Sequence, residues 1–224
     1  MTDESRWVEQ QLGHRFSDEN LLLQALTHRS AGSRHYERLE FLGDAALGLV
    51  VAEALFQRIP QAPEGHLSRL RASLVRRSTL AAMAREAGFP DRLRLGPGEL
   101  KSGGFRRDSI LADALEAVLG AVFLDGGLDA LRSAAIRLYG ERLERLPSHE
   151  TLKDPKTLLQ ERLQSKGLAL PVYRVESVEG EDHRQRFTVS CAVDALDARS
   201  AGSGSSRRAA EQAAAESMLA QIDA

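Results

Sequence analysis

Five carboxylates stand in two stretches of sequence that are otherwise largely apolar, and their spacing is helical. Glu37, Glu40 and Asp44 lie in YERLEFLGDAALGLVV, and Asp113 and Glu116 lie in SILADALEAVLGAVFL. Spacings of three and four residues place the members of each set on one face of a helix. An ionised carboxylate in apolar surroundings loses hydration and repels its neighbours. It therefore persists when it is protonated, paired with a base, or bound to a cation.

A hard divalent cation is the economical partner for these groups. The only basic residue within the two stretches is Arg38, and residues 110–124 contain no polar residue except Asp113 and Glu116, which predicts a helix buried almost all round. Oxygen ligands suit Mg²⁺ or Mn²⁺ and offer nothing soft for zinc. Such sites are typical of phosphodiester hydrolysis, where metals activate water and stabilise the leaving oxygen. A solvated acidic stripe is the alternative for a single pair, because charged residues are mostly exposed, but two such sets favour the metal site.

Beyond these carboxylates, longer motifs resemble those of the ribonuclease III family. ERLEFLGDAAL at 37–47 is similar to the family's signature, and DSILADALEAVLGAVFLD at 108–125 is similar to its second motif. LLLQALTHRS at 21–30 and EGHLSRLRASLVRR at 64–77 resemble further family segments, and the chain from Asp154 onward resembles the double-stranded-RNA-binding domain of bacterial members. The resemblance covers nearly the whole chain in the family's order.

This resemblance implies an all-α endonuclease domain over 1–146, a linker over 147–153, and a small α+β domain of α-β-β-β-α order over 154–224. It implies a metal-dependent endoribonuclease that cleaves double-stranded RNA, leaves 5′-phosphate and 3′-hydroxyl ends with short 3′ overhangs, and processes RNAs such as rRNA precursors. It also implies a homodimer whose two metal sites line one RNA channel, each site cutting one strand. Mg²⁺ is the expected cofactor, and Mn²⁺ is expected to substitute for it.

The resemblance also carries roles over to individual residues. Asp44 and Glu116 are expected to be catalytic, and Phe41 is expected to contact the partner subunit. The expected metal ligands are Glu40, Asp44, Asp113 and Glu116. The expected RNA contacts, drawn from both domains, are Glu37, Glu64, Thr157, Gln160, Glu161, Gln164, His183, Ser206, Arg207 and Arg208. Two positions depart from the family's usual pattern, with Tyr36 in place of Asn and Ala209 in place of Lys.

The C-terminal segment GSGSSRR at 202–208 has a physical logic of its own. It places glycines and two arginines at the start of an expected helix, where backbone N–H groups and the positive end of the helix dipole favour phosphate. Duplex RNA presents phosphates across a narrow major groove and 2′-hydroxyls in its minor groove. Thr157, Gln160, Glu161 and Gln164 share one face of an earlier helix and offer donors and acceptors to those hydroxyls.

Composition agrees with a soluble globular protein but does not point to nucleic acid. Hydrophobic residues make up 42% and charged residues 28% of the 224 residues, and the net charge is −2. A nucleic-acid binder is expected to be basic overall, so its basic residues would have to act through local clusters. The single cysteine, Cys191, excludes an internal disulfide and suits a reducing compartment. The polar N-terminus and the absence of an apolar run of about 20 residues predict a cytoplasmic protein without a membrane segment.

Periodicity predicts helices from residue 5 to about 146, with a Gly-rich, basic loop at 96–108. Glycine and proline predict helix ends at Gly13, at Pro60 and Pro63, at Gly88 with Pro90, and at Gly126 with Gly127. The last third predicts a helix near 155–166, strands in VYRVESVE and RQRFTVSCAV, a third strand near 195–201, and a helix from about 205.

Two other functional classes are weighed against the nuclease. A non-catalytic duplex-RNA-binding regulator would have no use for unpaired buried carboxylates. A helical metal-dependent phosphohydrolase of nucleotides would have no need of a second domain shaped for a long duplex. The sequence therefore favours the endonuclease.

Overall fold

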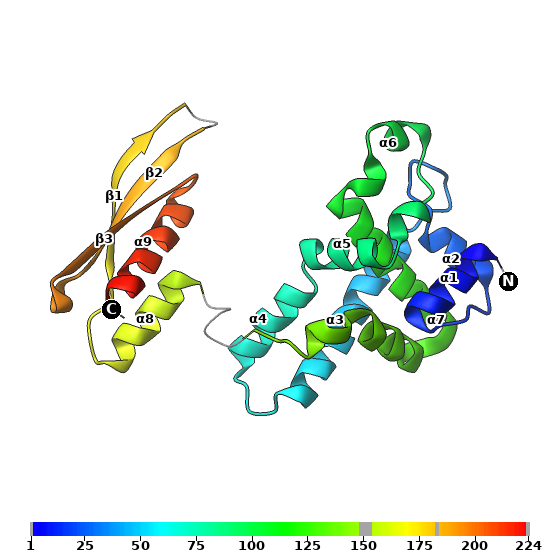
Figure 1. Ribbon diagram of the computed structural model, residues 1–224, viewed down its shortest axis with the longest axis horizontal. Helices are drawn as coiled ribbons and strands as arrows, with labels where there is room; N and C mark the ends of the chain where they lie inside the picture. The colour runs from blue at the N-terminus through cyan, green and yellow to red at the C-terminus, as the bar shows by residue number, and fades with distance from the viewer. Residues whose placement is uncertain (1, 148–153, 182–183, 223–224) are drawn as a thin grey trace. The chain divides into compact units, whose positions relative to one another are not determined.

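The chain folds into two compact units, Met1–Pro147 and Ser148–Ala224, in a computed structural model that describes residues 2–147, 154–181 and 184–222. The first unit is helical (Figure 1). Its α-helices are α1 (Asp3–Leu12), α2 (Glu19–Ala25), α3 (Glu37–Arg58), α4 (Glu64–Leu74), α5 (Arg77–Glu86), α6 (Pro97–Lys101) and α7 (Asp108–Tyr139). Short 3-10 helices are η1 (Phe89–Asp91), η2 (Gly104–Arg106) and η3 (Gly140–Leu143). The predicted linker lies outside the described residues except for Pro147.

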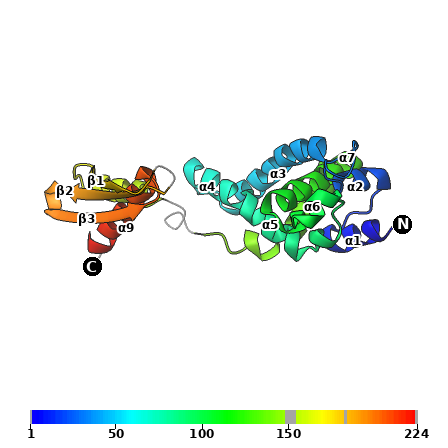
Figure 2. The ribbon, with the colours of Figure 1, turned by 90° about the horizontal axis from the view of Figure 1, so that it is seen from above.

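The contact between α3 and α7 organises the first unit (Figures 1 and 2). Gly43 of α3 faces Gly120 of α7, and the two backbones touch at this point. A Cβ atom on Gly43 would lie 1.8 Å from the carbonyl oxygen of Glu116, and one on Gly120 would lie 2.3 Å from that of Leu39. Only glycine permits so close an approach. The two acidic faces predicted from the sequence are therefore brought together by the crossing of their helices.

The first half of α7 is buried on nearly all sides, as its sequence predicts, from Ile110 to Val122. The predicted break at Gly126 and Gly127 is confirmed, because Gly127 leaves helical geometry, with φ of 76°, and makes a kink between the two helical segments of α7. Just before the kink, Asp125 accepts backbone N–H groups from Ser17 and Asp18, at 2.9 Å and 3.0 Å. This carboxylate ties the segment before α2 to α7.

The Gly-rich segment 96–107 is more ordered than the predicted loop. It contains α6 and η2, and the Arg107 guanidinium donates to Glu99 and Ser102, both at 2.9 Å. Gly96 is glycine because a Cβ would lie 2.2 Å from the carbonyl oxygen of Ser30. Local hydrogen bonds of this kind cannot be read from composition, which is why the sequence predicted a loop where these short helices form.

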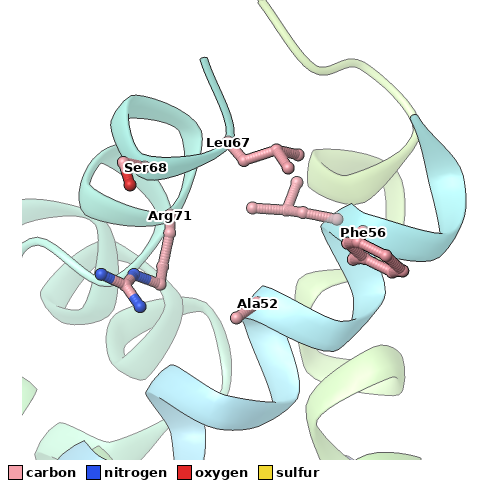
Figure 3. A pocket seen from close by; sticks show the side chains of 6 residues that line it. Ala52, Phe56, Leu67, Ser68 and Arg71 are labelled. Atoms are coloured by element: carbon pink, nitrogen blue, oxygen red, sulfur yellow. The ribbon is translucent and has the colours of Figure 1, made fainter. Parts of the chain in front are cut away.

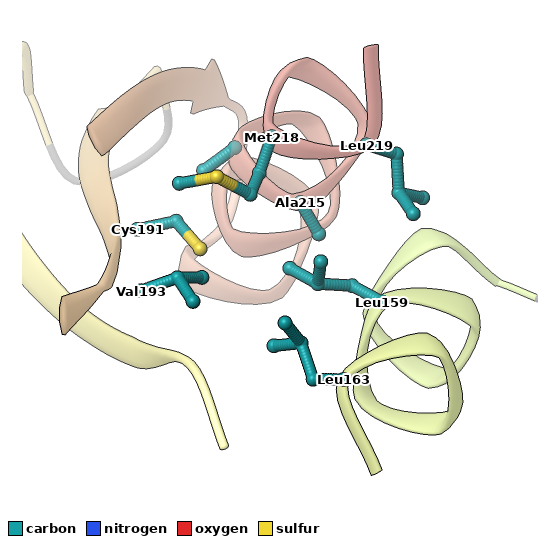
Figure 4. Close-up of a cluster of buried hydrophobic side chains, with 8 residues drawn as sticks. Leu159, Leu163, Cys191, Val193, Ala215, Met218 and Leu219 are labelled. Carbon is teal, nitrogen blue, oxygen red and sulfur yellow. The ribbon is translucent and has the colours of Figure 1, made fainter. Parts of the chain in front are cut away.

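The second unit has the predicted order helix, three strands, helix. α8 (Pro155–Ser165) and α9 (Arg207–Ile222) pack with the antiparallel sheet of β1 (Val172–Glu179), β2 (Arg186–Val193) and β3 (Ala198–Gly204), and η4 (Asp194–Leu196) joins the last two strands. The helices and β2 supply the core in Figure 4, which consists of Leu159, Leu163, Cys191, Val193, Ala214, Ala215, Met218 and Leu219. Burying a leucine side chain contributes about 1.5–3 kcal/mol to stability.

The third strand begins and ends three residues later than the predicted 195–201, because Asp194–Leu196 form η4. It runs to Gly204, because Gly202 and Gly204 let β3 lie directly on α9. A Cβ on Gly202 would lie 2.1 Å from the amide nitrogen of Ala214. Cys191 is a fully buried strand thiol.

Among the described residues, no helix has the length and apolar character needed to cross a membrane.

Gly43→Ala should destabilise the protein strongly, because its methyl group would collide with the backbone of α7. Overpacking of this kind costs about 1–3 kcal/mol, and backbone here cannot move aside as a flexible side chain could. Gly48→Ala is the matched control on the same helix, since a Cβ there meets nothing within 4 Å; it should instead stabilise by about 0.5–1 kcal/mol through helix propensity. Thermal unfolding of both variants measures the difference, and equal melting temperatures would contradict the close contact.

Candidate metal centre and nucleic-acid interface

The crossing of α3 and α7 gathers Glu40, Asp113 and Glu116. One carboxylate oxygen from each of these residues lies within 4.8 Å of the others, and all three side chains are half-buried. Among the described residues this is the one group of carboxylate, histidine or cysteine side chains with a spacing that could hold a metal ion. The three residues come from the two stretches of sequence that predicted an oxygen-lined site.

Burial raises the pKa values of all three carboxyl groups, and the charges of neighbouring carboxylates raise them further. Burial, followed by the charges of Asp44, Asp113 and Glu40, raises the pKa of Glu116 to about 8. Burial also raises the pKa of Glu40, with Asp113 as the main charged neighbour, and burial raises the pKa of Asp113. The cluster therefore holds negative charge at a free-energy cost that a bound cation would offset.

The donor set fits a hard divalent cation. All the available ligand atoms are carboxylate oxygens, which Mg²⁺ and Mn²⁺ prefer, and the partial exposure of the cluster leaves room for water in the remaining coordination positions. Carboxyl groups with raised pKa values in one cluster are also a frequent mark of functional sites.

The structure places the other predicted acidic residues around or away from this cluster. Asp44 is exposed and lies outside the group of three, although its charge contributes to the raised pKa of Glu116. Glu37 is exposed and is 3.3 Å from Arg29. Glu64 is the first residue of α4 and accepts a hydrogen bond from Ser68 at 2.6 Å, and it is not part of the cluster.

Three residues near the cluster were not predicted as site residues. Arg77, at the start of α5, is a nearby cation that opposes the raised pKa values of all three carboxyl groups. Tyr36, at the start of α3, is buried, and its ring meets the His28 ring at a centroid distance of 5.6 Å. The sequence signal for Arg77 was present but ambiguous, because it stands in a run of arginines typical of a solvated face.

In the second unit, the predicted RNA contacts on α8 divide into two kinds. Gln160, Glu161 and Gln164 are exposed on the helix surface. Thr157 is half-buried, and its hydroxyl donates to Asp154 at 2.8 Å in the cap of the helix. Because the hydroxyl proton of Thr157 is donated to Asp154, the hydroxyl oxygen can only accept a hydrogen bond from RNA. His183 lies outside the described residues.

The start of α9 lies beside the start of α8. Gln212 of α9 donates to Asp154 at 2.8 Å, and Lys156 pairs with Glu211 at 2.6 Å. Ser206 caps α9 by accepting the amide of Ala209 at 3.1 Å. The two helix N-termini therefore meet, which concentrates backbone N–H groups at one place.

The two arginines at this place differ in their surroundings. Arg207 pairs with Glu211 at 2.9 Å, whereas Arg208 makes no ion pair with any described residue. Both are exposed. Arg208 is thus the more available cation for a phosphate.

Large apolar side chains are exposed along α3. Phe41 is 81% exposed, Leu49 58% and Phe56 70%. Phe41 borders an open depression lined by Leu21, Gln24, Glu37, Arg38, Leu39, Leu42 and Leu124. Phe56 borders a second depression between α3 and α4, which Figure 3 shows with Ala52, Leu67, Ser68 and Arg71 around it. An exposed apolar surface of this extent is typical of a contact between proteins.

Comparison with known proteins connects both units to characterised sequences. The family described as Ribonuclease-III-like matches residues 18–143, and the double-stranded RNA binding motif matches residues 155–222. The chain is 55% identical to Ribonuclease 3 of Vibrio vulnificus strain YJ016 over 215 residues, covering 96% of each chain. It is 53% identical to Ribonuclease 3 of Vibrio cholerae over 222 residues, covering 99% of each.

Solved structures give the same result for the first unit. A crystal structure of the nuclease domain of ribonuclease III from Campylobacter jejuni is 41% identical, with a TM-score of 0.61, and covers 65% of this chain and 100% of its own. A second structure of that domain, whose title describes structural flexibility in a region involved in dimer formation, is 44% identical with a TM-score of 0.59, covering 61% of this chain and 95% of its own.

The metal-free protein should lose stability as the pH rises from about 4.5 to about 8. Over this interval folded Glu116, with its pKa raised from 4.5 to about 8, keeps a proton that the unfolded chain has lost, so the free energy of unfolding falls with rising pH. Glu116→Gln should remove this part of the dependence and gain stability relative to the native chain as the pH rises. Thermal unfolding of the native chain and of Glu116→Gln, both in chelator and at both ends of this pH interval, measures the effect. If the difference in stability between the two proteins does not change with pH, the pKa of Glu116 is not raised.

Proposed function

Because the chain belongs to the ribonuclease III family and is thus an endoribonuclease of double-stranded RNA, we propose that it hydrolyses RNA duplexes with Mg²⁺ bound at the α3–α7 cluster. Mn²⁺ is proposed to substitute. The products carry 5′-phosphate and 3′-hydroxyl ends with short 3′ overhangs, and precursors of rRNA are among the substrates, as in the family. The observation that carries the metal assignment is the convergence of Glu40, Asp113 and Glu116, with raised pKa values, at one partly open place.

Glu40, Asp44, Asp113 and Glu116 are proposed to be metal ligands, and Asp44 and Glu116 are also proposed to be catalytic. A divalent cation at this position supplies an activated water and charge stabilisation at the leaving oxygen. Asp44 is exposed beside Glu116, so its carboxylate can accept a proton or hydrogen bond from the attacking water. Arg77 adds a positive charge on the same side and can face the phosphate of the scissile strand.

The two units are proposed to divide the labour, with the nuclease and dimer contact in residues 1–146 and duplex binding in residues 154–224. On the second unit, Gln160, Glu161 and Gln164 face one minor groove, and Ser206, Arg207 and Arg208 face phosphates. Thr157 and His183 are proposed to complete the minor-groove contacts. Glu37 and Glu64 are proposed to contact RNA from the nuclease unit. The single buried cysteine supports the proposed cytoplasmic location.

We also propose a homodimer that uses the exposed face around Phe41. Two-fold symmetry suits a duplex, because the antiparallel RNA strands are themselves related by a two-fold axis. The exposure of Phe41 beside an apolar depression supports this assignment, since such a side chain gains free energy when a partner covers it. Each protomer contributes one carboxylate cluster, so two protomers supply the two cuts of a double-strand break.

The two alternatives are less well supported. A non-catalytic binder would not retain three converging carboxylates whose burial is costly. A nucleotide phosphohydrolase would not need the motif matched at residues 155–222.

Glu116→Gln should abolish cleavage of a long RNA duplex while leaving its binding intact. The substitution keeps size and hydrogen bonding but removes the charge that a metal requires, and the phosphate contacts of the second unit are untouched. Gel analysis of products and a filter-binding assay measure the two activities, and cleavage by the native chain in excess chelator is the companion experiment. Cutting that survives either the variant or the chelator would defeat the metal assignment, and Asp44→Asn tests the second catalytic residue in the same way.

Arg208→Ala should weaken binding to all duplexes alike and reduce the slope of log affinity against log salt by about one. Arg174→Ala is the matched control. Arg174 pairs in register with Ser190 on the face of the sheet opposite the buried Val189 and Cys191, away from both helices, so its slope should not change. If Arg208→Ala leaves the slope at the native value, this arginine does not contact phosphate.

Phe41→Ala should shift the protein toward monomer and reduce cleavage most at low protein concentration. If Phe41 is fully buried at the contact, its truncation costs about 3–5 kcal/mol of association free energy. Leu196→Ala, which truncates an exposed apolar residue in the other unit, is the control. Sedimentation velocity measures the oligomeric state, and a native chain that is monomeric while cutting both strands would rule out the shared channel.

A further inference from the structure

His28 and Ser30 lie between the start of α3 and the start of the Gly-rich segment 96–107, and neither belongs to the proposed metal cluster. The His28 ring meets the ring of Tyr36, whose carbonyl oxygen accepts the amide of Glu40 at 2.9 Å in the first turn of α3. On its other side, His28 is hydrogen-bonded to Ser30 at 2.7 Å. The pair therefore contacts both the helix that carries Glu40 and the segment that precedes α7.

The hydrogen bonds of this pair run in one direction. The amide of Ser30 donates to Nδ1 of His28 at 3.1 Å, so that nitrogen carries no proton and also accepts the Ser30 hydroxyl. The hydroxyl oxygen of Ser30 in turn accepts the amide of Gly96 at 2.9 Å. The series of hydrogen bonds therefore runs from the Gly96 amide to the Ser30 hydroxyl and from that hydroxyl to Nδ1 of His28. The imidazole is then neutral and protonated on Nε2. Burial lowers the pKa of His28, which agrees with a neutral ring.

The backbone reinforces this connection. The amide of His28 donates to the carbonyl oxygen of Arg94 at 3.0 Å, and Arg94 donates to that of Leu26 at 2.8 Å. Gly96 is in backbone contact with Ser30, as its glycine identity requires. The segment 96–107 is thus fixed at its beginning by Ser30 and at its end by the first residue of α7, five residues before Asp113.

This segment carries cations that face solvent. Lys101 is exposed and makes no ion pair with a described residue, and Arg106 is exposed with its guanidinium over the Phe105 ring. Glu99 of the same segment and Asp113 of the cluster are both charged neighbours of His28. Basic side chains beside a phosphodiester-cleaving centre can hold a duplex in register with that centre only if their distance from the carboxylates is fixed.

We propose that His28, acting through Ser30, is a positioning residue that fixes the basic segment 96–107 relative to the carboxylate cluster, so that Lys101 and Arg106 meet duplex phosphates in register with the cleavage site. The inference rests on the proposed function for the location of chemistry. It assigns His28 no contact with the reacting atoms. The Ser30 hydroxyl couples the segment 96–107 to catalysis.

Ser30→Ala removes both hydroxyl bonds and is the central test. Hydrogen exchange of the peptide spanning 94–107 should accelerate, and kcat/KM on duplex RNA should fall about tenfold, the size expected when a positioning bond worth about 1 kcal/mol or slightly more is lost. Ser30→Thr keeps the hydroxyl and should restore both quantities. Ser33→Ala, in the same exposed turn and without a hydrogen bond in the described structure, is the matched control and should behave as the native chain.

Variants of His28 test whether Nδ1 of this residue accepts the hydrogen bond from Ser30. His28→Asn keeps an acceptor near the position of Nδ1 and should retain slow exchange in 94–107, whereas His28→Gln extends past it and should behave as Ser30→Ala. Exchange that rises throughout the nuclease unit, or a loss of activity equal to the loss of folded protein, would show an ordinary structural role and overturn the proposal. Faster exchange in 94–107 with native kcat/KM would overturn it as well.

These outcomes are separable from failure of the metal assignment. Hydrogen exchange is measured in chelator and needs no cation, and kcat/KM is compared between variants under one set of conditions. If the native chain cleaves in chelator, the proposed metal is wrong, while the comparison of Ser30→Ala with Ser33→Ala still decides the role of the hydroxyl.

Discussion

The backbone contact between α3 and α7 is the constraint on which the nuclease unit depends. Glycine at 43 and at 120 allows the two helices to touch, and this contact brings carboxylates from both helices within reach of one oxygen-liganded cation. Any side chain at either position would move the helices apart and disperse the acidic groups. The same contact buries Glu40, Asp113 and Glu116, so the feature that creates the cluster also raises their pKa values. Burying these carboxylates lowers the stability of the fold, as is common at functional centres.

Glycines also allow a close backbone contact in the second unit. Gly202 and Gly204 allow β3 to lie on the backbone of α9, which sets the helix start beside that of α8. Two helix N-termini and the exposed Arg208 then share one surface. The overall charge of −2 does not oppose RNA binding, because affinity for phosphate depends on this local arrangement.

Much of the fold could be predicted from sequence because its signals are periodic. The helical carboxylate spacing, the apolar run from 110 to 124 and the alternation in β2 each report a local rule, and the structure follows them. What could not be predicted depends on contacts distant in sequence. The order in segment 96–107 comes from the hydrogen bonds of Arg107 to Glu99 and Ser102 and from that of Gly96 to Ser30. The position of Arg77 beside the carboxylates follows from packing of α5 on α7. The family resemblance places Asp44 among the expected ligands; in the structure its side chain is exposed outside the group of three, and its charge still contributes to the raised pKa of Glu116.

Glu40, Asp113 and Glu116 together are proposed to hold the divalent cation that this nuclease uses. The most direct measurement is anomalous scattering from crystals of the protein grown with Mn²⁺ at a concentration that supports cleavage. We expect an anomalous peak bonded to carboxylate oxygens of these three residues, and no such peak in crystals of Glu116→Gln. A native crystal with no peak between α3 and α7, or with its peak at other residues, would contradict it.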